Sequence, residues 1–238
     1  MSNKIAARTR RTQYDGGKNG EGVYQRIINL IPPHDVFIEA CAGSAAITRM
    51  IKPAITTILL EIDIVQSKVL QTELQDRAVI FNRSFINWYM FEMLAAPART
   101  FIFIDPPYMK EVRSDRRNIY THEWDEGDHV KFLSWLHCSP ASAAMVMITH
   151  PRNLLYENSL QGWNTVDFSY QTRGGIRQDC IWFNYTGPEV LHDYRYVGNT
   201  RTERQVIDRR IVRLIEKLAA LPGIERNAAI AAIHERFK

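Results

Sequence analysis

The stretch DVFIEACAGSAAI, residues 35–47, joins the two patterns that decide the fold. DVFIEA (35–40) is a short apolar run typical of a buried strand, and the segment from Ser44 to Ile51 has helical periodicity. The residues between them are small, so the turn is tight and its backbone can approach a ligand at the positive end of the helix. Its glycine spacing differs from the G-x-G-x-x-G of nicotinamide cofactor sites. A turn that serves only packing is the alternative.

The alternation of apolar strands and helices continues to about residue 150 and predicts an α/β fold, with a mostly parallel sheet covered by helices on both faces. The other predicted strands are 56–62, 78–82, 99–105 and 143–149, and the predicted helices are 23–31, 64–74, 86–94 and 130–136. Beyond these, Gly174-Gly175 predicts a β-hairpin. A helix broken at Pro222-Gly223 and a short helix at 227–237 follow. We expect a flexible basic arm (1–13), an α/β domain (14–194) and a basic helical appendage (195–238).

The net charge of +4 on 238 residues is unevenly distributed. Residues 1–26 hold six basic and two acidic side chains, and residues 195–238 hold ten basic and five acidic ones. The part between them holds fourteen basic and nineteen acidic side chains, so an acidic middle lies between two basic ends. Basic ends favour a nucleic-acid partner only weakly, because such charges often serve only to keep a protein soluble. A composition with 45% hydrophobic and 24% charged residues excludes wholesale disorder.

Three cysteines, Cys41, Cys138 and Cys180, are far apart, so they predict neither a disulfide framework nor a zinc site. They are typical of buried thiols in a reducing compartment. No apolar run approaches the roughly 18 residues of a membrane span. The N-terminal segment is basic and lacks the apolar region of a secretory signal. We therefore expect a cytoplasmic protein with no bound metal and no membrane contact; no oligomeric state is predicted.

An acid follows the second predicted strand. Glu61 lies 22 residues after Glu39, the acid that ends the first strand. In doubly wound sheets an acid at about this spacing commonly binds ribose hydroxyls. The alternative is a solvated carboxylate at a strand end, and Asp63 is a competitor two residues on.

The tetrapeptide Asp105-Pro106-Pro107-Tyr108 directly follows the apolar run FIFI (101–104). A carboxylate at the end of a central strand lies where ligands of α/β sheets bind. The prolines fix the backbone, and Tyr108 adds a flat apolar face with a polar tip. Two acceptors beside an aromatic platform suit an aromatic ring that carries an amino group. A strand cap followed by a turn is the alternative.

Taken together, these segments resemble the Dam-type DNA adenine methyltransferases, which use S-adenosylmethionine, over about residues 14–185. The matching positions are Tyr14, Gly16, Gly17 and Lys18 (Y-x-G-G-K), Glu39 to Ala45, Glu61, Asp105 to Tyr108 (D-P-P-Y), Tyr120, Asp128-His129, Leu160, Gly162, Trp163, and Arg177 to Asn184. The resemblance implies a Rossmann-like, S-adenosylmethionine-dependent methyltransferase fold and transfer of a methyl group to the N6 amine of adenine.

The resemblance also implies the site residues. The cofactor site is expected to comprise Tyr14, Gly17, Lys18, Glu39, Ala40, Cys41, Ala42, Gly43, Ser44, Glu61, Ile62, Ser84, Phe85 and Asp105. The catalytic residues are expected to be Asp105, Pro106, Pro107 and Tyr108: the Asp105 carboxylate and the Pro106 carbonyl accept hydrogen bonds from the amine, and Tyr108 stacks on the base. Direct transfer requires no metal and no cysteine nucleophile. We expect His129 and His150 to be structural.

A basic loop immediately follows the D-P-P-Y tetrapeptide. Its residues Lys110, Arg113, Arg116 and Arg117, together with Tyr120, are candidates for contact with substrate phosphates. A solvated loop is the alternative, since Glu111 and Asp115 offset two of the charges. Near the C-terminus, one apolar helical stripe is expected to dock onto the domain and the opposite face to be basic; the stripe is Ile207, Ile211, Leu214, Ile215 and Leu218, and the basic residues are Arg204, Arg209, Arg213 and Lys217.

The chain departs from the family pattern at several positions. Ala40, Cys41 and Ala45 replace a Pro, a Phe and a Gly, and Ser84 stands where an Asp commonly holds the cofactor adenine. The family's DNA-recognition domain normally precedes D-P-P-Y, but here only residues 86–104 separate Phe85 from Asp105. We therefore expect methylation of double- or single-stranded DNA with low sequence specificity. The alternatives are adenine methylation of RNA and a catalytically silent module that binds cofactor or nucleic acid.

Overall fold

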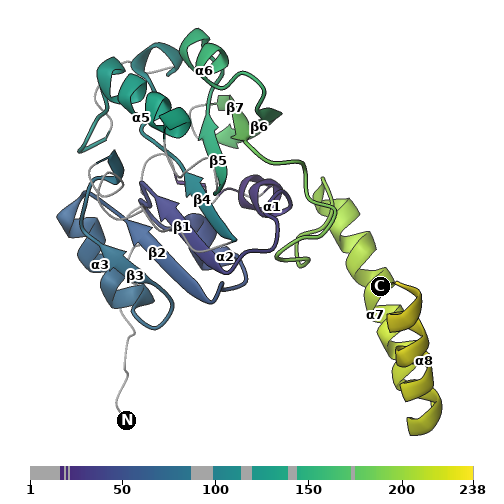
Figure 1. Cartoon of the computed structure of the whole chain (residues 1–238). Helices are drawn as coiled ribbons and strands as arrows, with labels where there is room; N and C mark the ends of the chain where they lie inside the picture. Colours follow the sequence, from purple (N-terminus) through teal and green to yellow (C-terminus); the bar gives the residue numbers. More distant parts are fainter. Residues whose placement is uncertain are drawn as a thin grey trace, which may run out of the picture. The chain divides into compact units, whose positions relative to one another are not determined.

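The computed structural model describes residues 17, 18, 20, 22–86, 99–113, 120–138, 144–172 and 175–237 (Figure 1). The chain divides into two compact units, Met1–Asp193 and Tyr194–Lys238. The predicted arm at 1–13 and nearly all of the predicted helix at 86–94 lie outside the described residues.

The described strands form one seven-stranded sheet in the order β3-β2-β1-β4-β5-β7-β6. The strands are β1 (Val36–Ala40), β2 (Thr56–Leu60), β3 (Val79–Phe81), β4 (Thr100–Ile104), β5 (Met145–His150), β6 (Asn164–Thr172) and β7 (Gly175–Phe183). Neighbours among β1 to β5 pair parallel, whereas β7 pairs antiparallel with both β5 and β6. The predicted Rossmann-like sheet with a C-terminal hairpin is confirmed.

The helices follow the strands in the expected alternation. The first unit contains α1 (Val23–Ile28), α2 (Ala46–Met50), α3 (Ile64–Leu74), the short 3-10 helix η2 (Lys110–Val112), α5 (Glu126–Cys138) and α6 (Leu154–Ser159). No periodicity in the sequence predicts α6, because a six-residue helix is too short to establish an apolar stripe. The Asn153 side chain caps α6 by accepting a hydrogen bond from the Tyr156 amide at 3.1 Å.

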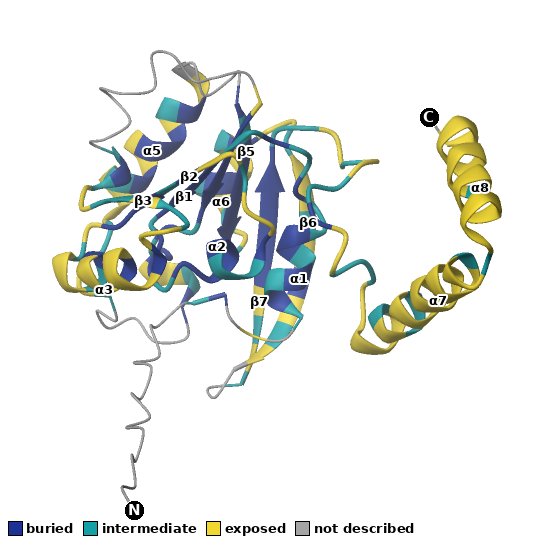
Figure 2. Cartoon of the chain, turned by 90° about the horizontal axis from the view of Figure 1, so that it is seen from below, coloured by how far each residue is buried: buried dark blue, intermediate teal, exposed yellow. Residues whose placement is uncertain are grey.

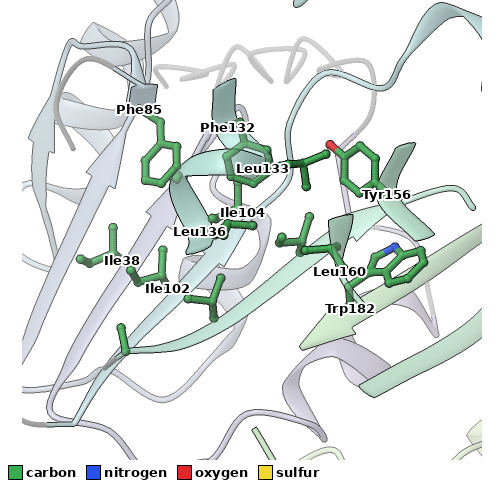
Figure 3. Close-up of a cluster of buried hydrophobic side chains, with 14 of the residues drawn as sticks. Ile38, Phe85, Ile102, Ile104, Phe132, Leu133, Leu136, Tyr156, Leu160 and Trp182 are labelled. Carbon is green, nitrogen blue, oxygen red and sulfur yellow. The ribbon is translucent and has the colours of Figure 1, made fainter. Parts of the chain in front are cut away.

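Apolar side chains cover both faces of the sheet. Alternate residues of a strand point to opposite faces, so Ile38, Ile102 and Ile104 share one face. They pack there with Phe132 and Leu133 of α5, and Tyr156 and Trp182 extend the same cluster (Figure 3). On the other face Leu59 packs with Leu70 and Leu74 of α3. Burial on both faces explains why these strands are continuous apolar runs.

The second unit contains two helices, α7 (Arg201–Ala219) and α8 (Gly223–Arg236). None of its described residues is buried, and Ile211, Leu214 and Ile215 of the α7 stripe are exposed (Figure 2). Docking of this stripe onto another surface stays a prediction. Among the described residues, no helix combines the length and the apolar composition that crossing a membrane requires.

Candidate active site

The turn after β1 adopts an unusual backbone. Cys41, Gly43 and Ala45 have φ values of 54°, 51° and 51°, all in the left-handed region. For Cys41 and Ala45, which carry a Cβ atom, this conformation costs about 1–2 kcal/mol each. The Ala42 amide donates to the Leu60 carbonyl at 2.9 Å, which joins the turn to the end of β2. The turn therefore lies at the carboxyl edge of the sheet and is held there by its neighbours.

Glu39 holds the beginning of α2. Its Oε2 accepts hydrogen bonds from the Thr48 amide at 2.8 Å and the Thr48 hydroxyl at 2.5 Å, and its Oε1 accepts from the Ile47 amide at 3.3 Å. Burial raises the pKa of the Glu39 carboxyl from 4.5 to about 7, although the hydrogen bonds oppose this change. The side chain thus caps the helix from β1, while its contact with a cofactor stays a prediction.

Glu61 joins the turns that follow β1 and β2. Its Oε2 accepts from the Gly43 amide at 2.7 Å and its Oε1 from the Asp63 amide at 2.8 Å. Each carboxylate oxygen has a second lone pair for another donor. Asp63 is engaged differently, because its Oδ1 accepts from the amides of Val65 and Gln66 and caps α3. The geometry therefore favours Glu61 over Asp63 as the acid that faces a ligand.

Asp105 lies at the carboxyl end of β4 in a buried polar network. Its Oδ1 is 2.8 Å from Lys18 Nζ and accepts from the Thr149 hydroxyl at 2.7 Å. Within the described part of the chain, Oδ2 accepts no hydrogen bond. Lys18 also donates to the Tyr108 hydroxyl at 2.7 Å, which donates to Asp179 Oδ2 at 2.6 Å. Burial raises the pKa of Asp105, and the charge of Lys18 opposes that change.

These groups line one cleft, which encloses about 780 Å³ including open solvent at its mouth. The predicted residues that line it are Gly17, Lys18, Glu39, Cys41, Ala42, Gly43, Ser44, Glu61, Ile62, Ser84, Phe85, Asp105, Pro106, Pro107 and Tyr120. The sequence analysis missed Ala46, Leu60, Arg83, Phe103, His122 and Trp124. His122 and Trp124 lie in a loop before α5 that carries no local signal of a site.

Three predicted residues lie elsewhere. Ala40 is fully buried and packs in the core, because its side chain points to the α5 face of the sheet. Arg113 is buried, and its guanidinium forms two hydrogen bonds with the Glu123 carboxylate at 2.9 and 2.7 Å, so its charge is neutralised within the protein. The Tyr108 ring, only 5% exposed, lines a second hollow beside the cleft. None of the three lines the cleft, so contact of Ala40 with the cofactor and of Arg113 with substrate stay predictions, while Arg113 and Tyr108 line the second hollow.

The remaining predicted residues divide into two groups. Lys110 is exposed in η2, and its contact with substrate stays a prediction. Tyr14, Gly16, Arg116 and Arg117 lie outside the described residues.

His150 supports the segment that follows the tetrapeptide. Its Nε2 accepts from the Met109 amide at 3.1 Å, so its Nδ1 carries the proton and donates to the Pro151 carbonyl at 2.8 Å. Burial lowers the pKa of His150 to about 3. Its ring stacks on Tyr156, whose hydroxyl lies 2.9 Å from His129 Nδ1. Both histidines thus have structural contacts, as predicted.

No family model and no curated protein matches this chain. Solved structures similar to it include TrmN from Thermus thermophilus (13% identity, TM-score 0.46, covering 67% of this chain and 46% of that chain). Another is the magnesium protoporphyrin IX methyltransferase ChlM from Synechocystis PCC 6803 with bound SAM (9% identity, TM-score 0.44, covering 68% of this chain and 75% of that chain). A third is the 23S rRNA methyltransferase ErmE (13% identity, TM-score 0.42, covering 85% of this chain and 88% of that chain). Because these likenesses are so distant, the fold assignment depends on the chain's own sheet order.

The left-handed turn predicts a position-specific cost at Ala45. Valine, being β-branched, is strongly disfavoured at positive φ, so Ala45→Val should lower the free energy of unfolding by about 1–3 kcal/mol. Ala45→Gly is the matched control: relief of strain offsets the lost buried methyl group, and stability should stay within about 1 kcal/mol of the parent protein. Urea unfolding followed by circular dichroism measures both. Equal stabilities of the two variants would contradict the strain argument.

The raised pKa of Glu39 predicts a pH-dependent stability. Between 4.5 and about 7 the folded state binds the Glu39 proton more tightly than the unfolded state does. The parent protein should therefore lose stability relative to Glu39→Gln as pH rises through this window, by at most about 3 kcal/mol. Urea titrations from about pH 5 to about pH 8 measure the difference. Glu189 is exposed, so Glu189→Gln is the control, and its free energy of unfolding should depend on pH as that of the parent does. The same pH dependence in Glu39→Gln and the parent would refute the raised pKa of Glu39.

Proposed function

We propose that this chain is an S-adenosylmethionine-dependent methyltransferase that methylates the exocyclic N6 amine of adenine in DNA, with low sequence specificity. The observation that carries the proposal is the arrangement of Asp105. One oxygen of this carboxylate is held by Lys18 and Thr149, and the carboxylate lines the cleft together with Pro106 and Pro107. This arrangement offers an oriented acceptor to an amine at the carboxyl end of a central strand, where ligands of such sheets bind.

The residues of the cleft fit the cofactor. Ile62 and Phe85 supply apolar surface to the cleft. Glu61 would accept hydrogen bonds from ribose hydroxyls with the lone pairs that Gly43 and Asp63 do not use. When bound, S-adenosylmethionine supplies a methyl group activated by its sulfonium. Ser84 offers a hydroxyl where the family commonly has a carboxylate.

The chemistry asked of the protein is positioning and electrostatic stabilisation. Asp105 Oδ2 and the Pro106 carbonyl would each accept a hydrogen bond from one N–H of the amine and so orient the nitrogen lone pair out of the plane of the ring. S-adenosylmethionine would supply the methyl group and leave as the neutral thioether, and the Asp105 carboxylate would stabilise the positive charge that the methylated amine carries until it loses one proton to solvent. Lys18 favours the ionised form of Asp105, which can act only as an acceptor.

Low specificity follows from the short segment between Phe85 and Asp105. Residues 86–104 include β4, which begins at Thr100, so little chain is left for a recognition domain. Base-specific contacts would then be few, and phosphate contacts carry no sequence information directly. RNA is the second candidate substrate, because the flipped adenine presents the same amine in both nucleic acids.

A methylation assay tests the proposal directly. The protein is incubated with methyl-labelled S-adenosylmethionine and with duplex DNA, single-stranded DNA or RNA, and digested nucleosides are identified by mass spectrometry. We expect N6-methyldeoxyadenosine in many sequence contexts, and a loss of about 10²–10³-fold in kcat for Asp105→Ala. Absence of N6-methylated adenine on every substrate would refute the enzyme assignment. Methylation of RNA alone would refute the assignment to DNA, and methylation of one short sequence would refute low specificity.

The ion pair between Lys18 and Asp105 predicts a change in the pH profile. Lys18→Met removes the charge that most opposes the raised pKa of Asp105, so that pKa should rise further. The active carboxylate then forms only at higher pH, and the acidic limb of kcat should move to higher pH with partial recovery of activity in alkaline buffer. Lys52→Met, which changes an exposed lysine, is the control and should leave the profile unchanged. An equal loss at every pH would contradict this role.

A further inference from the structure

A second hollow adjoins the Asp105–Tyr108 segment. It encloses about 1740 Å³, open solvent included, and is lined by the Tyr108 ring, by Arg26 of α1, and by Arg177 and Asp179 of β7. Arg26 of α1 and Arg177 of β7 therefore belong to the walls of the same hollow. The tetrapeptide thus contributes to both hollows: Asp105, Pro106 and Pro107 line the cleft, and Tyr108 lines the second hollow.

Two arginines of this hollow differ from the other two in their contacts with the described residues. Arg26 and Arg177 are partly buried, and neither forms an ion pair or a hydrogen bond with a residue in the described ranges. The other two arginines of the hollow differ. Arg152 donates to both carboxylate oxygens of Asp167 at 2.7 and 2.9 Å, and Arg113 is paired with Glu123. The hollow therefore presents positive charge specifically at Arg26 and Arg177.

The strand register places Arg177 close to the catalytic network. Arg177 and Tyr170 are directly paired across the hairpin, and Phe168 is paired with Asp179. Because side chains alternate along a strand, Arg177, Asp179 and Tyr170 share one face of the sheet. On that face Asp179 accepts hydrogen bonds from the hydroxyls of Tyr108 and Tyr170, and Tyr108 is bound to Lys18, the partner of Asp105.

We propose that Arg26 and Arg177 bind backbone phosphates of a nucleic-acid strand that lies in the second hollow while one of its bases enters the cleft. The inference rests on the proposed function and names the surface that holds its substrate. A guanidinium presents a planar fork of donors that matches phosphate oxygens, and a partly desolvated site strengthens the attraction. DNA and RNA strands share this phosphate chemistry. Arg26 and Arg177 would make the phosphate contacts that the sequence suggested for Arg113, whose guanidinium is paired with Glu123.

Binding of a fluorescein-labelled single strand of about 12 nucleotides, as DNA and as RNA of the same sequence, tests the inference. Fluorescence anisotropy is measured for the full chain between about 50 and 200 mM salt. Arg26→Gln and Arg177→Gln should each weaken binding several-fold, alike for all sequences, and each should reduce the slope of log affinity against log salt by about 0.7. The affinity of the DNA arm relative to the RNA arm identifies the strand that is preferred.

Arg99→Gln is the matched control, because Arg99 is an exposed arginine directly before β4, at the amino edge of the sheet. It should retain parent affinity and salt slope, and S-adenosylmethionine binding measured by calorimetry should be equal in all variants. Parent-like binding by both hollow variants, or an equal loss in Arg99→Gln, would overturn the inference. If the parent methylates no adenine but the hollow variants still lose affinity and salt slope, the proposed function fails and the phosphate contacts stand.

Discussion

The ion pair between Lys18 and Asp105 is the interaction on which the site depends. Both side chains are largely buried, and burying two charges is costly unless further hydrogen bonds satisfy them. Here the Thr149 hydroxyl donates a hydrogen bond to the Asp105 carboxylate. The Tyr108 hydroxyl accepts a hydrogen bond from the Lys18 ammonium and donates one to Asp179. Removing Lys18 would leave the buried Asp105 carboxylate without its compensating charge, and the same imbalance would raise the pKa of that carboxyl. The pair therefore ties a segment before α1, the end of β4 and strands β5 and β7 into one arrangement.

The neighbouring half of the site is built by backbone hydrogen bonds to carboxylates. Glu39 holds the amides that begin α2, and Glu61 holds the amides of Gly43 and Asp63. These bonds explain how the chain keeps a left-handed turn in which Ala45, despite its Cβ atom, has a φ of 51°. The carboxylates over-determine the backbone, so the turn tolerates strain that an isolated loop would release.

The sequence predicted the parts of the fold that depend on hydrophobic period. The strands were placed within about two residues of their observed ends, and α3 spans the predicted 64–74. The sequence could not reveal which charged side chains form ion pairs in the folded protein. Arg113 belongs to a basic run in the sequence, yet its partner Glu123 neutralises it only once the loop is folded. Thr149 joins the site because β5 lies beside β4, and that adjacency is a property of strand order rather than of any motif.

The same reasoning bears on the proposed phosphate contacts in the second hollow. Arg26 and Arg177 are remote from each other in the sequence, but α1 and β7 bring both to one hollow beside Tyr108. Clustering in the sequence is therefore a poorer guide to a binding surface than the pairing of each arginine among the described residues. The proposed contacts are to phosphates, which are the same in every nucleic-acid sequence. They would therefore hold a strand in place without discriminating between sequences. On the proposed function, selection would then occur at one step, the fit of the extruded base to the acceptors at Asp105 and Pro106.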